Sequence, residues 1–94
     1  MTNSEIAAVF TDIATLLRLK KDNIFKIRAY EKVARSILEL REPLDKIVAE
    51  NRLKEIPGAG EAITKKITEM VTTGKLDFYE RLKAERAAVR PEAK

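Results

Sequence analysis

The chain has 94 residues, which is the length of one domain and leaves room for a modest hydrophobic core. It contains no cysteine and no histidine, which excludes disulfides, Cys- or His-ligated metals and Ser-His catalysis. The net charge of +4 is concentrated at residues 20–41, which contain seven Lys/Arg and three Asp/Glu. Such a patch favours a polyanionic partner, and a solvated helix face is the alternative.

The first predicted helix covers Ser4–Leu19. Its apolar residues recur at the spacing of one helix face, and they are Ile6, Val9, Phe10, Ile13, Leu16 and Leu17. Thr2 and Glu5 have the spacing of a capping box at the start of this helix. The polar run at residues 20–23 predicts a loop, in which Asn23 can cap the next helix.

The second predicted helix covers Ile24–Leu40 and carries much of the positive charge. At a rotation of about 100° per residue, its apolar stripe consists of Ile27, Tyr30, Ala34, Ile37 and Leu38. Arg28 and Lys32 fall on the opposite face. Phe25 also falls away from the stripe, near the helix start, which is an unusual place for a large aromatic side chain.

Two further helices surround a glycine-containing turn. Pro43 opens a third helix over Leu44–Glu50. A fourth helix covers Glu61–Thr73, and Gly74 ends it with a left-handed cap. The core face of the fourth helix consists of Ile63, Ile67, Met70 and Val71.

A fifth helix begins near Asp77 and carries Tyr79 and Leu82. No segment has the alternating pattern of a strand, so the sequence predicts an all-α fold, a compact bundle of four to five short helices with one helix-hairpin-helix motif. We expect residues 1–88 to form the domain and residues 89–94 to be a frayed tail.

The most informative segment is the turn Ile56-Pro57-Gly58-Ala59-Gly60 before the fourth helix. Its glycines permit a tight bend and the close approach of a ligand. The first N–H groups of the following helix lack intrahelical partners, and the helix dipole adds about half a positive charge there. Apolar residues on both sides would hold the turn rigid, namely Leu53, Ile56, Ile63 and Ile67. The segment predicts a backbone site for DNA phosphate that reads no base, with an ordinary helix–helix turn as the alternative.

Two separated motifs resemble the amino-terminal lyase domain of family-X DNA polymerases, the DNA polymerase beta type. The segment Leu53–Leu76 is similar to the hairpin of that family, and Ile24–Arg35 resembles the matching helix of its bacterial and archaeal members. The first helix fits in length and position, so the resemblance covers nearly all of residues 3–83. It implies four short helices with the hairpin as the last pair, and binding to gapped or nicked DNA near a 5′-phosphate.

The resemblance also implies a cation site and a nucleophile. In that family a Na⁺ or K⁺ ion often sits in the hairpin, and the matching backbone carbonyls here are those of Lys54, Ile56 and Ala59. No other cofactor is expected. Lys66 occupies the position of the lyase nucleophile, whose neutral amine attacks the ring-opened aldehyde of an abasic sugar, forms a Schiff base and allows β-elimination. The adjacent charge of Lys65 and partial desolvation would lower the pKa of this amine, although a boundary lysine with a packed stem remains the alternative.

Further positions carry over from the resemblance. Lys26 matches a lysine that contacts the 5′-phosphate, and Lys32 matches a basic position. Tyr30 matches a tyrosine beside the nucleophile, but its place in the apolar stripe leaves a core role open. Phe25 replaces a histidine that stacks near the gap, and either base stacking or packing at the helix start would explain it. The expected DNA-binding residues are Phe25, Lys26, Arg28, Lys32, Pro57, Gly58, Ala59, Gly60, Lys65 and Lys75.

The chain also departs from that family. Ala62 stands where a second phosphate-binding lysine is found, and Glu31 and Phe78 replace further basic residues, which would weaken a 5′-phosphate pocket. No nucleotidyl-transfer motif with paired metal-binding aspartates is present, so the chain as it stands is not expected to polymerise. An excised domain and a free-standing relative both remain open, and we expect an attached or separate polymerase or nuclease domain as a partner.

The leading expectation is a sequence-nonspecific DNA-binding domain for gaps, nicks or 5′-phosphate ends, with abasic-site lyase activity left open. The alternatives are a non-catalytic helical protein-interaction module, which the presence of Gly58 and Gly60 disfavours, and an RNA-binding module. No apolar run reaches the roughly 18 residues of a membrane span, and Glu5 and Asp12 interrupt any signal-peptide pattern. We therefore expect a cytoplasmic, nucleoid-associated protein without a membrane partner.

Overall fold

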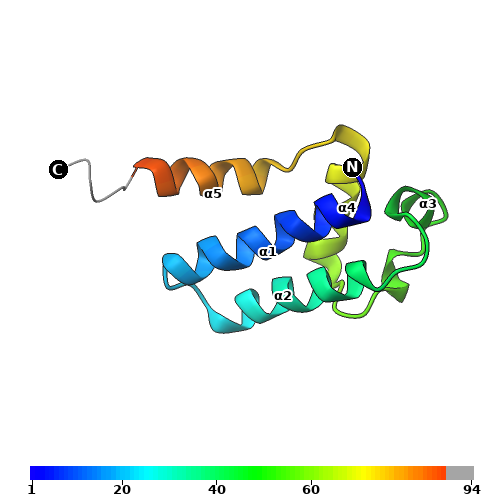
Figure 1. Cartoon of the computed structure of the whole chain (residues 1–94), viewed down its shortest axis with the longest axis horizontal. Coiled ribbons are helices and arrows are strands. Elements are labelled where there is room, and N and C mark those ends of the chain that lie inside the picture. Colours follow the sequence, from blue (N-terminus) through cyan, green and yellow to red (C-terminus); the bar gives the residue numbers. More distant parts are fainter. Residues whose placement is uncertain (89–94) are drawn as a thin grey trace.

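A computed structural model describes residues 1–88, which form five α-helices and one 3-10 turn and contain no strand (Figure 1). The elements are α1 (Asn3–Leu19), α2 (Ile24–Leu38), α3 (Leu44–Ala49), the 3-10 turn η1 (Leu53–Glu55), α4 (Glu61–Thr73) and α5 (Asp77–Ala88). The predicted all-α fold is confirmed, whereas the tail expected at residues 89–94 lies outside the described part of the chain. No helix in that part has both the length and the hydropathy to cross a membrane.

The predicted helices differ from the observed ones mainly at their ends. The first begins one residue earlier, the third ends at Ala49, and the second ends at Leu38 instead of Leu40. The second helix closes early because the N–H of Leu40 bonds back three residues to the Ile37 carbonyl, which tightens the last turn. The placement of Leu38 in the core was wrong, since Ile37 takes the buried position and Leu38, about 100° further round the helix, is 61% exposed.

Three predicted helix caps are present. The Thr2 hydroxyl accepts the Glu5 N–H at 3.1 Å, and the Glu5 carboxylate accepts the Thr2 N–H at 2.8 Å, which completes the capping box of α1. The Asn23 side chain accepts the Phe25 N–H at 2.7 Å at the start of α2. Gly74 ends α4 with a left-handed φ of 80°.

The helices α1 and α2 lie antiparallel and side by side, and α4 and α3 pack near one end of this pair (Figure 1). Their apolar faces form one core with α5, because each helix has a buried stripe that it cannot cover alone. The most deeply buried large side chains are Ile6, Phe10, Ile13, Val33, Ile37, Leu44, Ile67, Met70 and Leu76. The core therefore fixes the hairpin end of the molecule against the α1–α2 pair.

The last helix, α5, runs along α1 on the side away from α2 in Figure 1. Leu82 is 5% exposed and holds the helix to the core. Two polar contacts add to this packing: the Tyr79 hydroxyl donates a hydrogen bond to the Asp12 carboxylate, and Lys20 Nζ lies 3.0 Å from a Glu85 carboxylate oxygen. These contacts hold α5 along α1.

Candidate nucleic-acid interface

The hairpin turn presents its outer side to solvent. Pro57, Gly58 and Gly60 are exposed, and Ala59 is half-buried. The apolar residues around the turn pack inward as predicted, with Ile56, Ile63 and Ile67 buried and Leu53 partly buried against the core. The bend is thus anchored by its flanks while its own backbone stays accessible.

Two glycines serve the turn in different ways. Gly58 has a φ of 89°, in the region that other residues adopt only with strain. A Cβ atom on Gly60 would meet no heavy atom within 4 Å, and the φ of Gly60, −75°, is ordinary. The turn is closed by bonds from the Ala59 N–H to the Ile56 carbonyl and from the Gly60 N–H to the Gly58 carbonyl, both 3.1 Å. Gly58 is therefore required by the left-handed backbone conformation of the turn, and Gly60 leaves open space at the N-terminus of α4.

The start of α4 has free donors. Gly60 is its N-cap and provides no side-chain hydrogen bond. The first N–H that bonds back is that of Thr64, to the Gly60 carbonyl at 2.9 Å. Within residues 1–88, no acceptor is found for the three preceding N–H groups, those of Glu61, Ala62 and Ile63. A phosphate oxygen in front of Gly60 would meet several aligned donors and the positive end of the helix dipole.

The middle of α2 packs against the hairpin turn. The Ser36 hydroxyl donates a hydrogen bond of 2.8 Å to the Pro57 carbonyl. One turn earlier, the stem of Lys32 passes beside Gly58, so that a Cβ there would lie 3.2 Å from the Lys32 Cγ. The structure therefore brings Lys32 to the hairpin, although its helix position alone places it only on a polar face. Sequence reasoning missed Ser36, because nothing local marks a contact across 21 residues.

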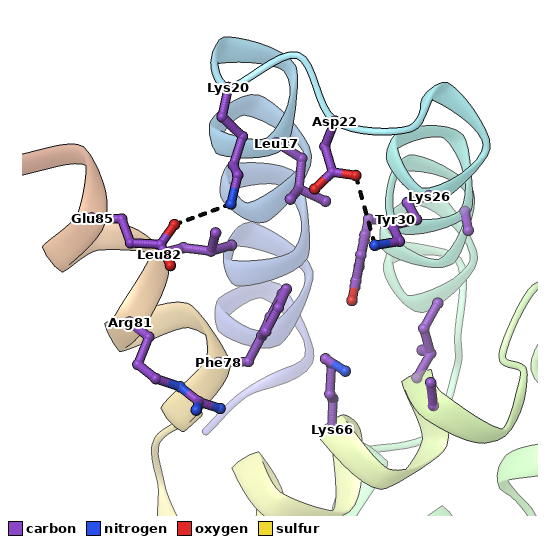
Figure 2. Close-up of a pocket in the computed structure, with 13 residues that line it drawn as sticks. Leu17, Lys20, Asp22, Lys26, Tyr30, Lys66, Phe78, Arg81, Leu82 and Glu85 are labelled. Carbon is purple, nitrogen blue, oxygen red and sulfur yellow. Dashed lines mark hydrogen bonds and ion pairs between the residues drawn. The ribbon is translucent and has the colours of Figure 1, made fainter. Parts of the chain in front are cut away.

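A hollow of about 640 Å³ opens between α2, α4 and α5 (Figure 2). We call it the Lys66 pocket. Its polar and aromatic lining consists of Lys20, Asp22, Lys26, Tyr30, Lys66, Phe78, Arg81 and Glu85. Ala62 and Ile63, from the first turn of α4, also line it. The pocket thus adjoins the free amides of the hairpin and combines cations with two aromatic rings.

Lys66 extends from α4 into this pocket, and its Nζ lies 4.7 Å from the centroid of the Phe78 ring. Burial lowers the pKa of the Lys66 amine; the nearby Glu69 carboxylate opposes this shift and the Lys26 ammonium group adds to it. Sequence reasoning named Lys65 as the neighbouring charge, and that was wrong. Lys65 is exposed and its Nζ lies 4.0 Å from a Glu61 carboxylate oxygen, because the next residue on a helix points to a different side.

Tyr30 belongs both to the core and to the pocket. Its side chain is 7% exposed and stacks on Phe10 and Phe78, with ring centroids 5.8 Å and 6.3 Å away. Figure 2 shows its hydroxyl directed toward the pocket. Burial raises the pKa of the phenol, and the charge of Asp22 adds to this, so the hydroxyl stays protonated near neutral pH. The core role left open by the sequence is therefore present, together with a polar end that faces Lys66.

The model of the helix-hairpin-helix domain family matches residues 1–76. The chain belongs to this family. Membership indicates a nucleic-acid-binding domain, with DNA as the expected ligand. No curated protein matches the chain. The family match ends before α5, so Phe78 and Arg81 lie outside the matched residues of this helix-hairpin-helix domain.

The predicted DNA-binding residues of the domain fall into separate groups. Lys32 lies at the hairpin, whereas Lys26 lines the Lys66 pocket and its Nζ is 3.6 Å from an Asp22 carboxylate oxygen. Three others are exposed and do not line that pocket, namely Phe25, Arg28 and Lys75. Phe25 is 74% exposed, as expected for a position off the core, and within residues 1–88 it is not among the hydrophobic side chains packed against that core.

Several pocket residues were not predicted as site residues. Lys20 and Asp22 come from the α1–α2 connection, and Arg81 and Glu85 come from α5. Phe78 was noted in the sequence only as a lost basic residue, but it forms one wall of the pocket. Their meeting depends on how α5 docks, and the sequence offers no local pattern for that contact.

Proposed function

We propose that this helix-hairpin-helix domain binds DNA without sequence preference at gaps, nicks or 5′-phosphate ends, as its resemblance to the family-X lyase domain implies. The observation that carries the proposal is the row of free N–H groups at Glu61, Ala62 and Ile63, next to an exposed turn. Main-chain N–H groups of the protein donate to phosphate oxygens and do not distinguish the bases. The affinity therefore depends on the sugar-phosphate backbone of the DNA and on the salt concentration.

A monovalent cation fits the hairpin carbonyls. Within residues 1–88, the Lys54 and Ala59 carbonyls accept no hydrogen bond, and the Ile56 carbonyl accepts one, from the Ala59 N–H, which leaves its second lone pair free. Carbonyl oxygens are hard ligands of the kind that Na⁺ and K⁺ take in proteins. An ion held by these residues would supply positive charge toward a DNA phosphate.

The second part of the proposal is abasic-site lyase activity at Lys66, with Tyr30 beside it. The neutral amine attacks the aldehyde carbon of the ring-opened sugar, and water leaves as the imine forms. Loss of a proton from the neighbouring sugar carbon then expels the 3′-oxygen as the leaving group, and hydrolysis of the imine returns the amine. Burial of Lys66 supports this role because it raises the share of neutral amine, and the Tyr30 hydroxyl is a donor directed toward the same space.

Such a domain would work with a polymerase or nuclease, attached or separate, that acts on the strand end after the abasic sugar has been removed. Its place would be the cytoplasm, on the nucleoid. The proposed DNA ligand, together with the resemblance to bacterial and archaeal family-X domains, supports both statements.

The Gly60→Ala variant tests the hairpin. The added methyl meets no protein atom within 4 Å, so we expect the free energy of unfolding to change by less than about 0.5 kcal/mol. The methyl would stand where the strand approaches, so the affinity for gapped duplex DNA, measured by fluorescence anisotropy, should fall about tenfold or more. Ser4→Thr adds a methyl at an exposed position of α1 and serves as the matched control.

Undiminished DNA affinity in Gly60→Ala, together with amide signals at residues 58–63 that do not shift when gapped DNA is added, would favour the protein-interaction alternative. Parallel titration with RNA of equal length addresses the RNA alternative, since a backbone grip need not reject a 2′-hydroxyl.

Borohydride trapping on gapped DNA with a 5′-abasic sugar tests the lyase. The wild-type protein should form a covalent adduct, and Lys66→Ala should lose it while keeping its affinity for gapped DNA within a few-fold. Lys46→Ala, which removes an exposed lysine of α3, should trap as well as the wild type. Full trapping by Lys66→Ala would exclude Lys66 as the nucleophile.

A further inference from the structure

Four cationic side chains line the Lys66 pocket, and only two of them are ion-paired. The pairs are Lys20 with Glu85 at 3.0 Å and Lys26 with Asp22 at 3.6 Å. In the part of the chain that the structure describes, no carboxylate forms an ion pair with Lys66 or Arg81. The pocket therefore has two cations available to an incoming anion without breaking an existing pair.

These two cations are not equivalent. Lys66 has to be neutral when it attacks an aldehyde, so it cannot also supply the lasting charge that holds a phosphate. The guanidinium of Arg81 is not deprotonated in proteins, and its planar fork donates two parallel hydrogen bonds to a phosphate. A phosphate monoester carries between about −1.5 and −2 charges near neutral pH, so it requires a cation that stays charged throughout.

The position of Arg81 is fixed by the docking of α5. Figure 2 shows Arg81 and Phe78 extending from α5, with Lys66 extending from α4. One turn of α5 carries the ring of Phe78, which stacks on Tyr30 at 6.3 Å between centroids, and the hydroxyl of Tyr79, which donates to Asp12. Arg81 lies two residues after Tyr79, is exposed, and lines the pocket. Its guanidinium is therefore accessible from solvent on a wall that is held in place.

We propose that Arg81 is a phosphate-binding residue of the Lys66 pocket, and that it holds the terminal 5′-phosphate of the strand whose first sugar reaches Lys66. The inference rests on the proposed function, which supplies the strand end. With Arg81 in this role, α5 forms one wall of the binding site. This helix lies outside the residues that the family match covers.

Arg81→Gln tests this inference. Fluorescence anisotropy compares two gapped duplexes that differ only in a 5′-phosphate or a 5′-hydroxyl at the downstream end of the gap. The wild type should bind the phosphorylated duplex about tenfold more tightly, because hydrogen bonds to a charged group contribute at that scale. Arg81→Gln should reduce this ratio to near one and leave affinity for the 5′-hydroxyl duplex almost unchanged. Arg81 is exposed, so the variant should fold, which its helical circular dichroism will verify.

Arg86→Gln is the matched control, because it removes the same charge from the same helix outside the Lys66 pocket. It should keep the wild-type ratio. A wild-type ratio in Arg81→Gln, or equal ratios in the two variants, would overturn the inference. So would wild-type protein that binds both duplexes equally well. By contrast, wild-type protein that binds neither duplex would overturn the proposed function itself.

Discussion

At Lys66, the surroundings act on the amine in opposite directions. Burial disfavours the ammonium form and lowers the pKa, whereas the Glu69 carboxylate favours that form. The face of the Phe78 ring, 4.7 Å from Nζ, also attracts a cation, by about 0.5–2 kcal/mol in general. The pocket thus holds the amine in place while easing the loss of its proton, which suits a group that must be positioned before it reacts.

The lowered pKa predicts how adduct formation depends on pH. An ordinary lysine has a pKa of about 10.4, and below its pKa the neutral fraction of an amine rises about tenfold per pH unit. Single-turnover trapping rates should therefore rise with pH. They should level off at a pH below the pKa of an ordinary lysine, because the pKa of Lys66 is lowered. The measurement is a rate series between about pH 6 and 10, with DNA affinity followed at each pH as the control. A flat or falling profile would contradict a neutral Lys66 as the attacking group.

Among the elements, α5 depends most on a few polar contacts. The hydrogen bond from Tyr79 to Asp12 is the main cause that raises the pKa of the Tyr79 phenol to about 12, and burial and the Asp12 charge add to it. The proton is therefore held more tightly in the folded than in the unfolded protein. This contribution to stability is complete below the ordinary tyrosine pKa of about 10, and it is lost as pH rises to about 12.

Tyr79→Phe removes this contact and keeps the ring. We expect a loss of about 1 kcal/mol, because a hydrogen bond to a charged group contributes about 1.5–3 kcal/mol and partial exposure reduces it. For a domain of this size, that loss lowers the unfolding temperature by about 4–8 °C. Thermal unfolding at pH 7 followed by circular dichroism measures it. The difference between variant and wild type should shrink in alkaline solution, and an unchanged unfolding temperature at pH 7 would show that the contact does not anchor α5.

For the molecule as a whole, α2 connects the hairpin with the Lys66 pocket. Its Lys26 lines the pocket, and its Lys32 and Ser36 contact the hairpin. The two lysines are six positions apart, which corresponds to about 9 Å along the helix axis. Under the proposed function, a strand bound at the hairpin would continue along α2 toward Lys66 and meet positive charge on the way.

This arrangement predicts salt-dependent binding without base preference. The slope of log affinity against log salt is about −0.9 for each duplex phosphate that is neutralised, so the double variant Lys26→Gln/Lys32→Gln should reduce the slope by about two units. Titrations between about 50 and 200 mM salt on two duplexes of unrelated sequence measure both effects. A preference of more than about tenfold for one sequence would show that bases are read.

Helix positions, caps and the hairpin could be predicted from the sequence alone. Each depends on residues within about four positions of one another: the capping box joins Thr2 to Glu5, and the left-handed φ at Gly74 follows from a residue without a side chain. The buried Ile63 and Ile67 follow from the helical period in the same way. Lys66 was found only through resemblance, since an isolated boundary lysine carries no local signal.

Only the tertiary structure decided which side chains share the Lys66 pocket and what supports the hairpin. Phe78 faces Lys66 and Lys32 passes beside Gly58 because the helices bury their apolar stripes against one another in one core. The same packing leaves Leu38 outside the core, against the prediction from its stripe. Local periodicity determines which face of a helix is apolar, but the partner of that face is chosen by the packing of the whole core, and the polar residues at its edge are brought together as a consequence.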